Sequence, residues 1–316
     1  MQILKTLALA GAAFTLVSIG PAFGQDRSAV NGWQPGVSGV VGFYGGAGES
    51  DSTFTNTSIC CGSFSFSDTN DLKVFGGYGR ATIPLTGGFN LQIDFFGEDK
   101  STKFDFGGSN SVSSLAGGAH LFWRNPNVGL LGVFASYGHV NVFETVYERR
   151  FGLEGQVFWG PVTLYGQGGY IGHENDGSTF NDTETDTGFM RGQIRYFLTD
   201  NAMLYGELAY YDSDTTFTAC CPSAASGSGE VVTYGAGGVY RFDNSPLAIY
   251  GSVMASNADQ TRINNFNTTV TEFDEVVGKF GIKLFLGTGS VKSNDRSGTS
   301  LDLVPFFPDQ NMRFLN

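Results

Sequence analysis

Apolar and polar residues alternate along much of this chain. In residues 189–198 the even positions are apolar or small, whereas the odd positions include Arg191 and Arg195. A β-strand places successive side chains on opposite faces, so this pattern predicts a strand with one apolar face and one polar face. The same alternation recurs around Asp94 and around Glu154.

Twelve segments share this character, each about ten residues long and bounded by turn residues. They lie near 36–47, 71–83, 88–98, 112–123, 128–139, 144–158, 161–172, 187–198, 202–212, 230–242, 246–256 and 273–286. Short connections such as Gly160-Pro161 and Asp200-Asn201 alternate with long polar stretches such as 48–70 and 213–229. The sequence therefore predicts an all-β fold, a transmembrane antiparallel up-and-down β-barrel of about 12 strands with short periplasmic turns and long extracellular loops.

Composition and the chain ends narrow the class of protein. A positive start, an apolar run and small residues before Gln25 predict a signal peptide over 1–24, followed by a short periplasmic segment over 25–35. The barrel is expected over 36–286 and a periplasmic tail, disordered or capping the barrel, over 287–316. The formal net charge of -12 makes nucleic acid an unfavourable partner.

Aromatic residues suggest which face of the strands meets lipid. Trp123 and Trp159 lie beside short turns and Tyr137 and Tyr170 lie toward the long connections, as two interfacial girdles require. We therefore expect the apolar face to point outward and the polar face to line the interior.

The last predicted strand, 279–286, carries a further pattern. Lys279, Gly281, Leu284 and Leu286 match a polar residue, a glycine two places on, and apolar residues three and five places after the glycine. In these positions the chain resembles the insertion signal of Gram-negative outer-membrane β-barrel proteins. That resemblance implies location in the cell outer membrane, with outer-membrane lipid, lipopolysaccharide and the barrel-assembly machinery as partners.

Charged residues on the polar faces suggest what the interior does. The interior is expected to hold basic Arg80, Arg150, Arg191, Arg195, Arg241, Lys279 and Lys283 and acidic Asp94, Glu148, Glu154, Glu207 and Glu275. This basic excess resembles twelve-stranded, porin-like channels for acidic oligosaccharides, although an internal salt-bridge network that plugs the barrel would explain the same charges. We expect a narrow passive channel for small solutes, anionic ones among them. The alternative is a closed structural or surface-interaction barrel that serves adhesion or envelope integrity through its extracellular loops.

The sequence shows no arrangement typical of a catalytic or metal-binding site. The outer-membrane phospholipase family places a His and a Ser two residues apart on one strand, whereas His139-Val140-Asn141 carries Asn at the nucleophile position. The stretch 173–186 is rich in carboxylates but lacks the spacing of a calcium loop, which favours a solvated acidic loop. We expect no enzymatic activity, no cofactor and no metal site.

Four cysteines lie in two of the long connections, as Cys60-Cys61 and Cys220-Cys221. In an exported protein they are expected to form disulfides. Vicinal bonds would be strained, so we expect crossed pairing that ties the two loops into a lid over the barrel mouth. Vicinal disulfides and a metal held by paired thiolates are the alternatives.

Overall fold

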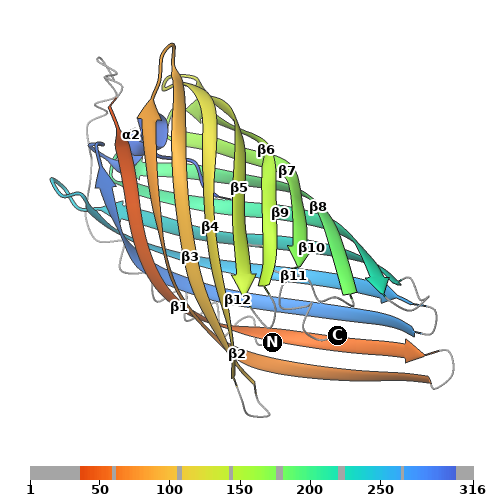
Figure 1. Ribbon diagram of the computed structural model, residues 1–316. Helices are drawn as coiled ribbons and strands as arrows, with labels where there is room; N and C mark the ends of the chain where they lie inside the picture. Colours follow the sequence, from red (N-terminus) through yellow and green to blue (C-terminus); the bar gives the residue numbers. More distant parts are fainter. Residues whose placement is uncertain are drawn as a thin grey trace.

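The protein is a closed barrel of twelve antiparallel strands in chain order, with β1 hydrogen-bonded to β12 (Figure 1). The computed structural model describes residues 36–58, 62–104, 109–141, 145–175, 181–219, 225–264 and 267–303. The predicted fold class and strand number are confirmed.

Eleven strands are longer than the segments predicted for them, and β6 has the predicted length. Their bounds are β1 (Ser38–Ser58), β2 (Gly62–Pro84), β3 (Phe89–Phe104), β4 (Ser109–Asn125), β5 (Gly129–Asn141), β6 (Thr145–Trp159), β7 (Val162–Asn175), β8 (Asn181–Thr199), β9 (Ala202–Ala219), β10 (Ala225–Arg241), β11 (Leu247–Ile263) and β12 (Asn267–Leu286).

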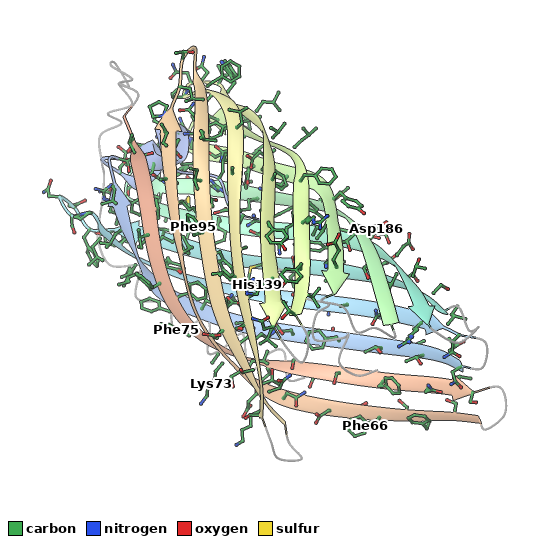
Figure 2. The ribbon with its side chains drawn as sticks, viewed as in Figure 1. Phe66, Lys73, Phe75, Phe95, His139 and Asp186 are labelled. Carbon is green, nitrogen blue, oxygen red and sulfur yellow. The ribbon has the colours of Figure 1, made fainter. Side chains whose placement is uncertain are left out.

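The faces of the strands are arranged as the alternation predicts. Phe95 and Leu153 on the outer face are each 65% exposed, whereas Asp94 and Glu154 beside them are 0% and 3% exposed. Figure 2 shows Phe75 and Phe95 on the outside of the ribbon. A soluble barrel would bury the apolar set, so exposing it suits an apolar solvent around the barrel.

The additional strand length lies in the stretches that were expected to be loops. β1 and β2 stay paired from Ser38↔Thr82 out to Ser58↔Gly62, and β12 pairs with β1 over nearly the same length. The β1–β2 hairpin extends past β3, whose pairing with β2 ends at Asn70↔Phe104 (Figure 1). Hydroxyl pairs support its outer half, with Thr53 and Ser67 oxygens 3.0 Å apart. Most of its side chains there are polar, and only residues 63–67 alternate (Ser-Phe-Ser-Phe-Ser), which is too short a stretch to predict the bounds of either strand.

After β12 the chain turns back into the barrel. Gly287 adopts a positive φ of 77°, which glycine accommodates without strain, and the short helix α2 (Val291–Ser297) follows. Ser290 caps this helix through its side chain, which accepts from the Ser293 backbone N–H. None of the described helices is long and apolar enough to cross a membrane.

Candidate functional site

The interior wall carries every charged side chain that the alternation assigned to it. Arg150, Arg191, Arg195, Arg241, Asp94, Glu148 and Glu154 are buried, and Arg80, Glu207, Glu275, Lys279 and Lys283 line the internal cavity. The structure adds Arg124, Lys100 and Glu98, which lie on the same inner face. Most of these groups are paired with one another, so the wall is a polar network.

One buried cluster is centred on His120, which is fully buried between two carboxylates. Its Nδ1 lies 2.7 Å from Glu154 Oε1 and its Nε2 lies 3.3 Å from Asp94 Oδ2. Gln92 donates to Asp94 at 2.8 Å, and the Tyr165 hydroxyl donates to Glu154 at 3.1 Å. These bonds link β3, β4, β6 and β7 across the wall and leave no reactive group open to solvent.

A second set of ion pairs joins strands that are not neighbours. Lys279 on β12 pairs with Glu98 on β3, and Lys100 on β3 pairs with Glu275 on β12. Both bonds pass the inner faces of β1 and β2, where Gly46 occupies an inward position. They therefore narrow the interior on the side of the long hairpins.

The C-terminal segment, residues 287–303, fills the interior at the opposite end, where the short turns lie. Its Asp295 is 3% exposed and accepts from Arg195 Nη1 at 2.6 Å and from the Thr163 hydroxyl at 2.7 Å. Arg124 donates to the Gly298 carbonyl and to the Ser300 hydroxyl, the latter at 2.7 Å. Arginines of the wall therefore bind the carboxylate, carbonyl and hydroxyl groups of this segment.

The end of the described segment is held most tightly by charge. Asp302 pairs with Arg80, lies 3.2 Å from Arg195 Nη2 and lies 3.8 Å from Arg191 Nη2. Burial alone would raise the pKa of this carboxyl, but Arg80, Arg195, Arg191 and Lys283 together hold the pKa well below its usual range. Asp302 is therefore an anion bound in an arginine cluster.

Leu301 anchors the same stretch by packing and by its backbone. Its side chain is 0% exposed and packs with Phe122, Leu130 and Tyr165. Its carbonyl accepts from Gln92 at 2.9 Å and from Arg80 at 3.1 Å. The segment thus satisfies its backbone groups on the wall and acts as an internal plug, a term used below for residues 287–303.

A cavity of about 410 Å³ lies in the interior, lined partly by the plug and partly by the wall. Tyrosines give it its character, because Tyr44, Tyr78, Tyr205 and Tyr250 all line it. Glycines on neighbouring strands make room for these rings: a Cβ at Gly76 would lie 2.5 Å from the Tyr44 hydroxyl oxygen. This pairing of inward glycine with inward tyrosine was not recognised in the sequence.

Other predicted sites have mixed outcomes. Lys279 and Gly281 face inward, Leu284 and Leu286 face outward, and their role as an insertion signal stays a prediction. His139 faces outward (Figure 2), and its ring meets that of Tyr147 in an edge contact with the two ring centroids 6.2 Å apart.

The cysteines and the acidic stretch can be placed only in part. The segments 1–35 and 304–316 and the four cysteines Cys60, Cys61, Cys220 and Cys221 lie outside the described residues. In the acidic stretch, Glu174 pairs with Arg149 and Asp186 accepts from Tyr170. Within the described part of the chain, no three His, Cys, Asp or Glu side chains gather as a metal site would require.

The acidic residues of the plug, Asp295 and Asp302, were missed as interior residues. A signal for them did exist, because the predicted interior held more basic than acidic side chains and buried charges require partners. The missing carboxylates lie in the tail, which shows no strand periodicity that could have placed it.

Comparisons with known proteins are consistent with a barrel and go no further. No protein-family model matches the chain, and no curated protein matches it by sequence. Among solved structures, an outer-membrane channel from Pseudomonas putida F1 is 16% identical with a TM-score of 0.44, covering 76% of this chain and 94% of that one. A FadL homologue from Pseudomonas aeruginosa is 8% identical with a TM-score of 0.41, covering 79% of this chain and 90% of that one. The outer-membrane protease OmpT from Escherichia coli is 9% identical with a TM-score of 0.39, covering 81% of this chain and 98% of that one. At these values the likenesses carry no inference about activity.

Proposed function

We propose that this chain is an exported outer-membrane barrel that acts as a passive channel for small anionic solutes and is closed at rest by its own plug. The outward apolar face is the support for the membrane location. The observation that carries the channel function is the mode of closure. The plug is a separate segment that follows the last strand, and ion pairs with arginines of the wall hold it. Once the plug leaves the interior, these arginines would face the path of the solute.

The charge of the interior supports an anionic solute. With the plug in place, Asp295 and Asp302 balance Arg80 and Arg195. When the plug leaves, these guanidinium groups lose carboxylate partners and the interior becomes more positive. Fixed charge in a narrow, low-dielectric passage acts on ions at close range, so the open barrel is expected to prefer anions.

Planar-bilayer recording tests this function. The unmodified chain is expected to conduct rarely, whereas the double variant Asp295→Asn with Asp302→Asn should open more often and should shift its reversal potential toward that of the anion in a salt gradient. Asp259→Asn is the matched control, because Asp259 is exposed near the end of β11, away from the plug.

Two outcomes would count against the proposal. If neither the unmodified chain nor the double variant conducts, the closed structural barrel is favoured. The ion pairs Lys279–Glu98 and Lys100–Glu275, which cross the interior, would then keep the barrel closed without the plug. Cation preference in the open variant would contradict the role of the arginines.

A further inference from the structure

One cation of the tyrosine-lined cavity, Lys283, forms no direct ion pair. Lys283 lines the cavity, and its Nζ lies 4.3 Å from the ring centroid of Tyr250 and 5.8 Å from that of Tyr78. No carboxylate among the described residues forms an ion pair with it. The faces of aromatic rings attract a cation, but more weakly than an anion does in a partly dehydrated place.

Neighbouring cations in the same cavity differ from Lys283 in this respect. Arg80 lies 4.5 Å from the centroid of the Tyr78 ring and also pairs with Asp302. Lys279 lies 4.9 Å from the centroid of the Tyr44 ring and also pairs with Glu98. Each of them combines one ring with one carboxylate in an ion pair, whereas Lys283 lies over two rings and attracts Asp302 only from beyond ion-pair distance.

The part of the cavity around Lys283 is aromatic, whereas charged side chains such as Arg150 and Glu207 line other parts of it. Tyr44 and Tyr250 meet edge to face with centroids 6.5 Å apart, and Tyr78 and Met203 pack against the same buried cluster. Aromatic rings favour such edge contacts with one another, and thioether sulfur packs well against rings. The volume of about 410 Å³ falls within the range of small-ligand pockets.

We propose that this cavity binds a small aromatic carboxylic acid, with its carboxylate on Lys283 and its ring among Tyr44, Tyr78, Tyr250 and Met203. The proposal rests on the channel function above and specifies its solute class. The charge of Lys283 favours a ligand with a carboxylate, and the rings favour a ligand with an aromatic ring. A simple inorganic anion lacks the ring and a neutral aromatic molecule lacks the charge, so neither uses the whole site.

Titration calorimetry on the full-length folded protein tests the site, with benzoate as the probe. Benzamide removes the charge, acetate removes the ring, and cyclohexanecarboxylate keeps the charge but replaces the aromatic ring. Benzoate is expected to bind at least about tenfold more tightly than each of the three, since one charge-assisted contact or one aromatic contact is lost in each case.

Variants separate recognition from folding. Lys283→Met should weaken benzoate about tenfold or more and leave benzamide unchanged, whereas Lys283→Arg should retain benzoate binding. Lys73→Met is the control, because Lys73 is exposed on the outside of β2 (Figure 2). Folding of each variant is checked by heat-modifiable migration on a gel.

Several results would overturn the site. Equal binding of benzoate and benzamide would remove the role of charge, and equal binding of cyclohexanecarboxylate would remove the aromatic specification. Unchanged affinity in Lys283→Met, or no benzoate binding to the unmodified protein, would end the proposal. Calorimetry does not depend on conduction, so this failure is distinct from a failure of the channel function.

Discussion

Replacing Arg195 by Gln should release the plug without unfolding the barrel. Arg195 pairs with Asp295 at 2.6 Å and with Asp302 at 3.2 Å, and it donates to the Ser300 carbonyl at 3.1 Å. The side chains of Arg195 and Asp295 are only 6% and 4% exposed. Gln cannot supply the charge, so the variant leaves a buried carboxylate without its counter-ion.

The size of the effect follows from that burial. Removing one partner of a buried ion pair costs about 3–5 kcal/mol because the remaining charge stays dehydrated. Asp295 can escape that cost only if the segment that carries it leaves the interior, so the penalty falls on plug docking. At the lower bound of about 3 kcal/mol, the undocked population rises about 150-fold.

Hydrogen–deuterium exchange by mass spectrometry measures this population directly. Peptides from residues 287–303 should exchange about 150-fold faster in Arg195→Gln, while central strand peptides keep their protection. Arg149→Gln is the matched control, because Arg149 pairs with Glu174 on the surface, where both side chains are more than half exposed and such a pair contributes at most about 1 kcal/mol. Equal exchange of the plug in all three proteins, or uniform loss of protection across the barrel, would refute the reasoning.

Three further perturbations test other parts of the structure. On the lipid face, Leu153→Arg should cost about 2–4 kcal/mol in denaturant unfolding from vesicles, and an unaffected midpoint would argue against lipid contact there. Because the pKa of Asp302 is lowered in the folded protein, its contribution to plug docking is complete above the ordinary carboxyl range near about 4 and is lost only as pH falls through the lower folded value. Conductance should therefore stay low from pH 7 to about 4 and rise below it, and opening already at neutral pH would contradict the arginine cluster. Gly76→Ala should destabilise the barrel by about 1–3 kcal/mol through a clash with Tyr44, whereas Gly79→Ala, which has open space around its Cβ position, should be nearly neutral; equal melting of the two would refute the tight packing.

Local rules were sufficient for the part of the barrel in which the two faces of each strand differ. Side chains such as Arg191 and Met190 fall on opposite faces because a strand has a period of two, and short turns fix antiparallel neighbours. Where one face of a strand meets an apolar surrounding and the other a polar interior, the residues on the first face are apolar and those on the second are polar or charged. The inward assignment of charges followed from that difference.

The same rules failed where the surroundings are alike on both faces. The outer halves of β1 and β2 are mostly polar, and within 48–70 only residues 63–67 alternate, which is too few to give the bounds of the two strands. Their pairing depends on backbone hydrogen bonds that every sequence can form, which local composition does not reveal.

What the sequence by itself determined is therefore the barrel, its strand number and the sense of its faces, because each follows from contacts between near neighbours in the chain. Only the tertiary structure decided what fills the barrel. Asp302 meets Arg80 across 222 residues of sequence, and Lys279 meets Glu98 across 181. Such pairs depend on closure of the sheet and on the return of the tail into it, and no local pattern encodes which buried charge will find which partner.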